Sequence, residues 1–260
     1  MAKSNGYDRS FFLEQQTSSR QSAEHVVPAV IECIRPSSVI DVGCGLGAWL
    51  AVFRKHGIED KNLLGVDGDY VDRTLLQIPR DCFQARDLSK PLALHRTFDL
   101  AMSLEVAEHL PPERADDFIA ELTSLAPVVL FSAAIPHQGG VSHVNEQWQD
   151  YWVRIFASHG YEVHDVIRPI LWDNRDVLAY YCQNTFLYVK KERLKDYPQI
   201  TLMDRTLSRN PLPVVHPRIW AGLVYVTHPD HIPLASATRQ WIRSLSAAIR
   251  RRLPGTQRKI

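Results

Sequence analysis

Short apolar segments alternate with longer segments of helical periodicity through most of the chain. The predicted strands are 38–42, 62–67, 81–87, 98–103, 127–134, 161–167 and 184–191. The predicted helices are 22–34, 48–57, a segment after Asp67, 111–125 and 146–160. Parallel strands need a crossover of about a dozen residues, and helices of this length supply it. The alternation therefore predicts an α/β fold, with a mostly parallel sheet covered by helices on both faces.

The last two predicted strands, 161–167 and 184–191, are joined by a loop without a clear crossover helix. Such a connection favours a hairpin, so we expect an antiparallel strand at one edge of a seven-stranded, doubly wound sheet. The predicted domain covers 35–191. It follows an N-terminal helix or lid at 1–34 and precedes a C-terminal extension at 192–260.

Composition narrows the classes of protein. Thirty Lys and Arg residues balance 29 Asp and Glu residues, so the net charge of +1 gives no global attraction to nucleic acid or membrane. The four cysteines are far apart, which fits a reducing compartment, and no apolar run reaches the ~20 residues that cross a bilayer. The N-terminal residues lack the apolar stretch of a signal peptide. We therefore expect a soluble, cytoplasmic protein.

Three closely spaced glycines follow the first predicted strand. The segment Asp41-Val-Gly43-Cys-Gly45-Leu-Gly47 turns directly into a predicted helix. Glycines here let the backbone approach a flat or phosphate-bearing ligand that a Cβ atom would block, although a tight turn without a ligand has the same composition. Asp67 ends the second strand, where an acidic residue often binds ribose hydroxyls. The pattern predicts a site for a nucleotide-like ligand.

The same segment also satisfies a dinucleotide-binding fingerprint, with Ala48 in the place of its last glycine. An NAD(P)-binding oxidoreductase is therefore an alternative. The chain has no Tyr-x-x-x-Lys pair, however, and no second lobe long enough for a separate substrate domain. A non-catalytic cofactor-binding protein is a further alternative, because a cofactor cleft alone does not establish turnover.

Four segments, taken in order, resemble the class I S-adenosylmethionine-dependent methyltransferases. They are DVGCGLG from Asp41, GVD ending at Asp67, ARDLSKPL at 85–92 and SLEVAEHL at 103–110. The resemblance covers roughly 30–190. It implies a Rossmann-like sheet of seven strands, parallel except for the last, inserted strand, and S-adenosylmethionine as the cofactor.

The resemblance also assigns roles to individual residues. It implies that the backbone from Gly43 to Gly47 lies against the methionine part of the cofactor, in a motif that begins with Asp41. Asp67 would accept the ribose hydroxyls. Asp87 would face the adenine amino group, with Leu88 lining the ring, and Ser103 to Glu105 would close the methionine side.

A second group of polar residues follows the fourth and fifth predicted strands. Glu105, Glu108 and His109 have the spacing i, i+3, i+4, which puts them on one face of a helical turn, and His143 stands three residues before Glu146. The set is similar to that of metal-dependent 2′-O-methyltransferases of small-RNA 3′ ends and of quinone-biosynthesis O-methyltransferases. That similarity implies Mg²⁺ or Mn²⁺ held by Glu105, Glu108, His109 and His143. Glu-x-x-Glu-His also occurs in methyltransferases without a metal.

A hydroxyl that accepts a methyl group needs a base or a metal near neutral pH. His143 is the first candidate for the catalytic residue, and His109 is the second. Trp148, Tyr151 and Trp152 accompany this polar loop and could stack on a sugar ring, or pack in the core. We expect O-methylation of a small-molecule or sugar hydroxyl, with a nitrogen acceptor or an RNA 3′ end as alternatives. The balanced charge argues against a nucleic-acid partner.

The two ends of the chain carry further predictions. The aromatic segment YDRSFF at 7–12 is a candidate lid over the cofactor. VVHPRIW at 214–220 resembles C-terminal segments of bacterial methyltransferases of glycan and surface-polysaccharide assembly. Residues 237–255 predict a basic amphipathic helix that packs on its own domain, on a homodimer partner or on a membrane surface.

Overall fold

The structure, a computed structural model, describes residues 9–207, 213–227 and 238. The chain forms two compact units, Met1–His216 and Pro217–Ile260. The first unit contains the sheet and all of the predicted site residues.

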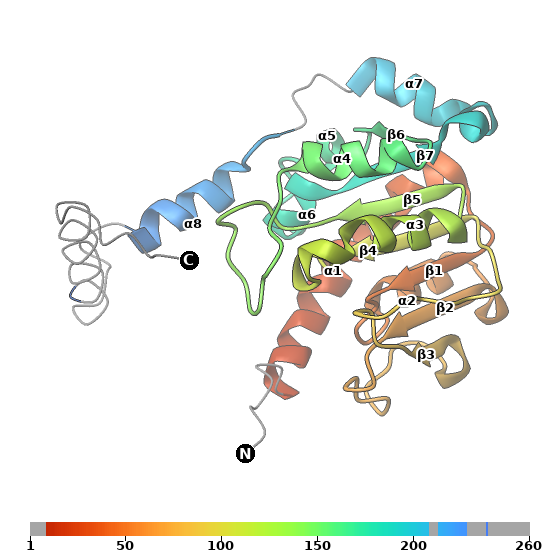
Figure 1. The fold of residues 1–260 in the computed structure, drawn as a ribbon, viewed down its shortest axis with the longest axis horizontal. Helices are drawn as coiled ribbons and strands as arrows, with labels where there is room; N and C mark the ends of the chain where they lie inside the picture. Colours follow the sequence, from red (N-terminus) through yellow and green to blue (C-terminus); the bar gives the residue numbers. More distant parts are fainter. Residues whose placement is uncertain (1–8, 208–212, 228–237, 239–260) are drawn as a thin grey trace, which may run out of the picture. The chain divides into compact units, whose positions relative to one another are not determined.

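Seven strands form one sheet, in the order β3-β2-β1-β4-β5-β7-β6 (Figure 1). The strands are β1 Val39–Val42, β2 Leu63–Asp67, β3 Phe83–Ala85, β4 Leu100–Leu104, β5 Val128–Ser132, β6 Tyr161–His164 and β7 Phe186–Lys190. All neighbours from β3 to β5 are parallel, whereas β7 is antiparallel to both β5 and β6. The predicted α/β sheet with an antiparallel last strand is confirmed. Strand β7 is inserted one place in from the edge, which β6 forms.

Helices cover both faces of the sheet. The α-helices among the described residues of the first unit are α1 Arg9–Ile34, α2 Ala48–Lys55, α3 Ala115–Leu125, α4 Gln149–Ser158, α5 Arg168–Leu171, α6 Ala179–Asn184 and α7 Pro198–Leu207. The second unit contains α8 Pro217–Thr227, which is described by itself. Side chains alternate between the faces, so that Val39 packs in the core beneath α1 and α2 while Ile40 packs beneath α3 and α4. This alternation explains why every residue of β1, β2, β4 and β5 is buried.

Two predicted helices differ from the structure. Helix α1 is longer than predicted and continues through Pro28, whose side chain lies on its exposed side. No α-helix lies between β2 and β3, because residues 68–79 form turns and bends and only the short 3-10 helix Arg80–Cys82 follows them. Asp72 stabilises one of them, since its Oδ1 accepts hydrogen bonds from the Thr74 amide at 2.9 Å and from the Thr74 hydroxyl at 2.6 Å. Polar groups that bond locally in this way favour turns over helices.

The connection between β6 and β7 contains two short helices, α5 and α6, rather than a bare loop. Strand β6 ends at His164, three residues earlier than predicted. Asp165 there forms a buried ion pair with Arg168, whose Nε lies 2.8 Å from Oδ1 of the aspartate. The guanidinium also lies over the ring of Phe186, at 4.2 Å from its centroid. This pairing directs the chain out of the sheet and into α5.

Several predictions concern the ends of the chain. Residues 7 and 8 of the predicted lid lie outside the described residues, and residues 9–12 begin α1. Apart from residue 238, the predicted basic helix at 237–255 also lies outside them. Among the described residues, no helix combines the length and the apolar character that crossing a membrane requires. The four cysteines are buried free thiols.

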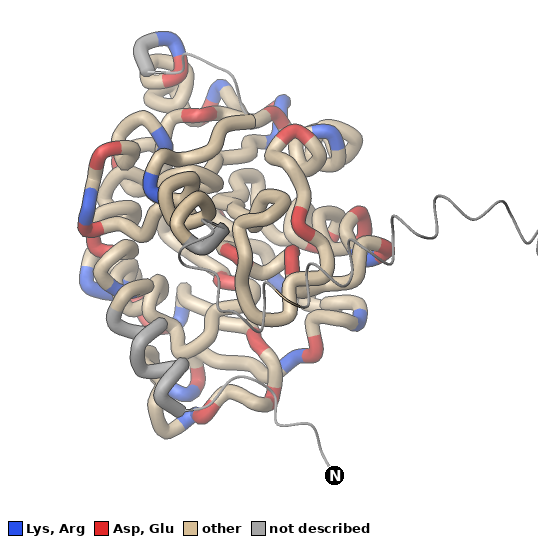
Figure 2. The backbone as a smooth tube through the Cα atoms, turned by 90° about the vertical axis from the view of Figure 1, so that its left-hand side faces the viewer, with Lys and Arg blue, Asp and Glu red and all other residues tan. Residues whose placement is uncertain are grey.

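Figure 2 shows Lys and Arg residues interspersed with Asp and Glu residues along the backbone on the face that it draws.

Candidate active site

The glycine segment lies between β1 and α2, and all three of its glycines, Gly43, Gly45 and Gly47, have positive φ angles that other residues rarely adopt. Gly43 has φ +89°, and a Cβ atom added to it would lie 2.3 Å from Cγ2 of Val106. Gly45 has φ +53°, and a Cβ atom there would meet nothing within 4 Å. The first glycine therefore permits close packing beneath the loop, and the second leaves an open backbone surface that a ligand can approach.

Asp67, at the end of β2, fixes the glycine segment in place. Its Oδ2 accepts a hydrogen bond from the Gly45 amide at 2.7 Å. Its Oδ1 accepts hydrogen bonds from the Gly68 amide at 2.6 Å and from the Tyr70 hydroxyl at 2.5 Å. The side chain is buried, and these charge-assisted bonds compensate for its burial.

Asp41 is a buried carboxylate on the neighbouring strand, β1. Its Oδ2 has no hydrogen-bond partner. Burial and, secondarily, the nearby charge of Asp67 raise the pKa of Asp41 to about 8. The cofactor side of the sheet therefore contains one carboxylate with three donors and one with an unused oxygen.

Asp87 and Leu88 follow β3, as the resemblance implied, but Asp87 is bonded to its own turn. Its Oδ1 accepts hydrogen bonds from the Ser89 amide at 3.1 Å and from the Ser89 hydroxyl at 2.6 Å. These bonds and the ion pair with Lys90 lower the pKa of Asp87. Leu88 is half-buried against the core under α3 and α4. Asp87 is exposed, so a ligand can still reach it.

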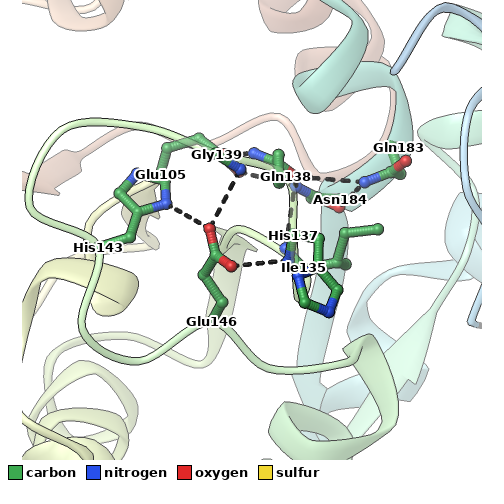
Figure 3. Close-up of polar contacts among 9 residues, drawn as sticks. All are labelled: Glu105, Ile135, His137, Gln138, Gly139, His143, Glu146, Gln183 and Asn184. Carbon is green, nitrogen blue, oxygen red and sulfur yellow. Dashed lines mark hydrogen bonds and ion pairs between the residues drawn. The ribbon is translucent and has the colours of Figure 1, made fainter. Parts of the chain in front are cut away.

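Ser103 and Glu105, the next predicted residues, lie in different surroundings. Ser103 lies inside β4, is completely buried and has an unpartnered hydroxyl. Glu105 follows the strand with φ +55°. Its Oε2 accepts a hydrogen bond from Nε2 of Gln138 at 2.8 Å, and its Oε1 accepts one from Nδ2 of Asn184 at 3.2 Å (Figure 3). Burial raises the pKa of Glu105, and these hydrogen bonds oppose the rise.

Glu108 lies in the short turn Ala107–His109 and is completely buried. Within the part of the chain that the structure describes, no donor has hydrogen-bond geometry to either carboxylate oxygen. Burial and the charge of Glu105 raise the pKa of Glu108 well above its usual value, and nearby backbone amides at Glu108 and Ala134 offset this rise only in part. An unpaired buried carboxylate is costly, so this group marks a position where a ligand or a proton is expected.

The loop after β5 brings His143 to this turn. The backbone carbonyl of Glu108 accepts hydrogen bonds from the amides of Val144 at 2.8 Å and Asn145 at 3.0 Å. The rings of His109 and His143 meet edge to face, with centroids 4.8 Å apart. One possible ligand atom from each of Glu108, His109 and His143 lies within 4.8 Å of the other two. We refer to these three residues as the Glu-His-His cluster.

A glutamate orients His143. Oε1 of Glu146 lies 2.9 Å from Nδ1 of His143, and its two oxygens also accept the backbone amides of His137 at 2.8 Å and Gly139 at 3.2 Å (Figure 3). Burial alone would raise the pKa of Glu146, but the hydrogen bond from His143 and those from the amides lower it. A Cβ atom at Gly140 would lie 2.2 Å from Nε2 of His143, so the loop packs closely over the ring.

One prediction about this side of the site is wrong, and for Trp152 the structure decides between the two alternatives in favour of the core. Glu105 does not share a helical face with Glu108 and His109, because its left-handed backbone turns the chain before the next turn begins. It lies outside the Glu-His-His cluster. Trp152 is almost fully buried and packs on Phe131, with ring centroids 5.2 Å apart, so it cannot stack on an acceptor. The side chain of Trp148, in contrast, is 42% exposed.

The sequence analysis missed a set of amide side chains. Nε2 of Gln183 donates to Oε1 of Gln138 at 3.2 Å, and Nδ2 of Asn184 donates to the same oxygen at 2.9 Å. Oε1 of Gln183 accepts the backbone amide of His216 at 2.7 Å. This network joins Glu105 to the C-terminal part of the first unit. The signal in the sequence was the polar run Gln183-Asn184-Thr185 immediately before an apolar strand. The structure buries all three of these residues.

Comparisons with known proteins support this arrangement. The family described as "Methyltransferase domain" matches residues 15–165. No curated protein matches the sequence.

Three solved structures are similar. The sugar N-methyltransferase KedS8 from a Streptoalloteichus species is 16% identical, with 74% of this chain and 96% of that chain covered and a TM-score of 0.55. An O-methyltransferase family protein from Burkholderia thailandensis is 14% identical, with 70% and 58% covered and a TM-score of 0.50. Magnesium protoporphyrin IX methyltransferase from Synechocystis is 18% identical, with 71% and 90% covered and a TM-score of 0.47.

The structural likenesses concern the fold, while the family match covers more than half of the chain and includes the glycine segment, Asp67 and the Glu-His-His cluster. The strand order, the inserted antiparallel β7 and the glycine turn after β1 agree with it. The chain belongs to the methyltransferase domain family, among the class I S-adenosylmethionine-dependent methyltransferases.

Proposed function

We propose that the protein transfers a methyl group from S-adenosylmethionine to a hydroxyl oxygen of a small molecule, in particular a sugar or glycan. The observation that carries this proposal is the Glu-His-His cluster, in the loops that follow β4 and β5. Acceptors of open α/β sheets bind at these carboxyl ends. A hydroxyl is a poor nucleophile near neutral pH and needs a base or a metal, and the cluster can provide either.

On the cofactor side, S-adenosylmethionine supplies an electrophilic methyl group on its sulfonium sulfur. The open backbone surface at Gly45 and the unpartnered Oδ2 of Asp41 fit a ligand that has several hydrogen-bond donors. Asp67 binds the ribose hydroxyls. A carboxylate has about four lone-pair sites, and the side chain of Asp67 already accepts three hydrogen bonds from within the chain, so about one site remains for the ribose. Asp87 is exposed and is assigned to the adenine amino group.

On the acceptor side, His143 is the base in a scheme without metal. Glu146 accepts a hydrogen bond from Nδ1, which selects the tautomer with a lone pair on Nε2. That nitrogen then takes the proton of the acceptor hydroxyl as the methyl group is transferred. Burial and the nearby His143 lower the pKa of His109, so His109 stays neutral and adds no positive charge beside the base.

The same residues also fit a divalent cation. Both oxygens of Glu108 and Nδ1 of His109 are buried without hydrogen-bond partners, which is the state expected of atoms that await a ligand. Glu108, His109 and His143 would hold the ion, and a bound ion would lower the pKa of an acceptor hydroxyl. Two imidazoles favour Mn²⁺ over Mg²⁺. Glu105 is not a ligand in this scheme, because Gln138 and Asn184 occupy its oxygens.

A sugar acceptor is supported by the surroundings of the cluster. Trp148 immediately precedes α4 and is partly exposed, and exposed indoles can stack on sugar rings. The amide and imidazole groups of the loop before it, at residues 137–147, can bond to hydroxyls. An RNA 3′ end is the alternative acceptor, and the balanced charge of the chain argues against it.

A screen for methyl transfer tests the proposal. The full chain is incubated with labelled S-adenosylmethionine and, separately, with nucleotide sugars, glycans and short RNAs, with and without Mn²⁺. A mass gain of one methyl group on a sugar oxygen is expected. Transfer to RNA alone, or to a nitrogen of the acceptor, would contradict the proposal. The variant His143→Ala serves as the control for transfer that does not use the cluster.

A further inference from the structure

The two carboxylate oxygens of Asp67 are used unequally within the chain. Oδ1 accepts hydrogen bonds from the Gly68 amide at 2.6 Å and from the Tyr70 hydroxyl at 2.5 Å, and Oδ2 accepts one from the Gly45 amide at 2.7 Å. Each carboxylate oxygen has about two lone-pair sites. Oδ1 therefore has no site left for a further donor, whereas the described residues leave about one site on Oδ2.

The ribose of S-adenosylmethionine has two adjacent hydroxyl groups. Two neighbouring donors pair best with a carboxylate when each donates to a different oxygen, which is the bidentate arrangement that a guanidinium also uses. That arrangement needs one free lone-pair site on Oδ1 and one on Oδ2. One of the two donors on Oδ1 of Asp67 must therefore leave when both ribose hydroxyls bind.

Of these two donors, the Tyr70 hydroxyl is the one that can leave. The Gly68 amide belongs to the backbone directly after β2, in a turn that the Val71 amide closes by donating to the Gly68 carbonyl at 3.2 Å. Moving this amide would require the turn to move. The Tyr70 hydroxyl lies at the end of a side chain, so a change of rotamer removes it from Oδ1 while the backbone stays in place.

The ring of Tyr70 lies directly against Gly68. A Cβ atom added to Gly68 would be 2.1 Å from Cε1 and 2.4 Å from Cδ1 of this ring. Gly68 does not have the positive φ angle of Gly43 and Gly45, so its backbone conformation alone does not require glycine. The glycine instead permits the close approach of the ring. With the ring in this position, Asp67 is only 5% exposed.

We propose that the Tyr70 hydroxyl takes the place of one ribose hydroxyl on Oδ1 of Asp67 in the cofactor-free protein, and that the cofactor displaces it. Tyr70 keeps the buried carboxylate hydrogen-bonded until the cofactor binds. It also limits the affinity for the cofactor, because the bond between Tyr70 and Asp67 must break before both ribose hydroxyls can bind. The inference rests on the proposed assignment of Asp67 to the ribose and does not depend on the methyl acceptor.

Titration calorimetry with two ligands tests the proposal. Tyr70→Phe removes the competing hydroxyl and keeps the ring, so S-adenosylhomocysteine should bind this variant about fivefold more tightly than the unaltered chain. The 2′-deoxy analogue of S-adenosylhomocysteine has one ribose hydroxyl left, which can use the remaining site on Oδ2. The affinity for this analogue should therefore be the same for both proteins. Tyr70 is 62% exposed, so the variant should fold normally, which urea unfolding verifies.

Tyr197→Phe is the matched control. Tyr197 lies near Asp99, which precedes β4 at the opposite end of the parallel strands from Asp67, so this variant should bind both ligands as the unaltered chain does. An unchanged or weaker affinity of Tyr70→Phe for S-adenosylhomocysteine would overturn the proposal, as would an equal gain in affinity for the 2′-deoxy analogue. If the unaltered chain binds no S-adenosylhomocysteine, the proposed cofactor itself is wrong.

Discussion

Asp67 ends β2, and Glu108 lies in the turn after β4, on the other side of β1 in the sheet. Both side chains are buried carboxyl groups, but their surroundings differ. Asp67 accepts three hydrogen bonds from the residues around it. Glu108 accepts none at its carboxylate oxygens. Desolvating a carboxylate is unfavourable unless donors or a cation replace the lost water. Asp67 therefore has its partners within the chain, whereas the partners of Glu108 must come from outside, as a proton, a cation or a ligand.

The strongest test of this difference is to remove the charge of Glu108 without changing its shape. If a cation uses this residue, Glu108→Gln and a chelator should each lower turnover by about 10²-fold or more, and Mn²⁺ should restore the chelated enzyme. In the metal-free scheme the chelator has no effect, and Glu108→Gln should instead raise stability, because the amide needs no proton uptake on folding, whereas the buried carboxyl must take up a proton or carry an unpaired charge. Turnover with and without chelator, together with urea unfolding, distinguishes the two.

The control for this comparison is Glu162→Gln, since the side chain of Glu162 is 48% exposed. His143→Ala should reduce turnover by about 10²- to 10⁴-fold in both schemes, because either the base or a ligand is lost. Full activity of His143→Ala on the true substrate would contradict both schemes and would direct attention to His109 or His137.

The next largest effect is expected at Asp67. Asp67→Asn replaces one accepting oxygen with a donor group that faces other donors, so the affinity for S-adenosylhomocysteine should fall by about 1.5 to 3 kcal/mol. Titration calorimetry measures this change. Asp69→Asn is the control, because Asp69 is 84% exposed and two residues away. If Asp67→Asn lowers stability but binds as well as the unaltered chain, Asp67 only shapes the glycine segment.

Asp41 gives the cofactor side a pH dependence. Its pKa in the folded protein is about 8, against 3.8 as its usual value. Between these pH values the folded protein holds a proton that the unfolded chain has lost, so the free energy of unfolding decreases as pH rises. The contribution is at most about 1.4 kcal/mol per pH unit and ends above pH 8.

Urea unfolding without cofactor, at several pH values from 5 to 8, measures this slope. Asp41→Asn should flatten it, because the amide does not titrate, whereas Asp69→Asn should leave it unchanged. Equal slopes for the unaltered chain and Asp41→Asn would show that the buried carboxyl of Asp41 keeps its ordinary pKa.

The smallest effect is expected in the amide network. Gln183→Ala removes the acceptor for the His216 amide and one donor to Gln138. Because these bonds position the acceptor side only, KM for the acceptor should rise several-fold, which corresponds to a total loss of about 1 kcal/mol, while S-adenosylhomocysteine affinity stays constant. Gln21→Ala, on α1, is the matched control. An equal loss of cofactor affinity would mean that the network supports the whole domain.

The sequence predicted the cofactor side better than the acceptor side, for a physical reason. The positions of Gly45 and Asp67 follow from strand ends and short spacings, which are local properties, and the hydrogen bond between their elements joins adjacent parallel strands. The predicted grouping of Glu105 with Glu108 assumed helical backbone. The backbone of Glu105 is instead left-handed, and nothing in the local spacing indicates that.

Long-range contacts were harder to foresee. Asn184 is 79 residues from Glu105, and His216 is 33 residues from Gln183. Pairings of this length depend on where β7 inserts in the sheet. The buried run of amides before β7 indicated that polar partners were needed, but it did not identify them. The core position of Trp152 likewise depends on its packing against Phe131 of β5.

The backbone amide of His216 donates a hydrogen bond to Gln183, so the acceptor side is completed late in the synthesis of the chain. The elements that hold the glycine segment, β1, β2 and β4, are all present once residue 104 has been made. The acceptor side needs β7 and then residue 216. Because contacts between nearby segments form before those that close long loops, the growing chain acquires its cofactor side first. A chain released before residue 216 would therefore retain the elements of the cofactor side but lack a finished acceptor pocket.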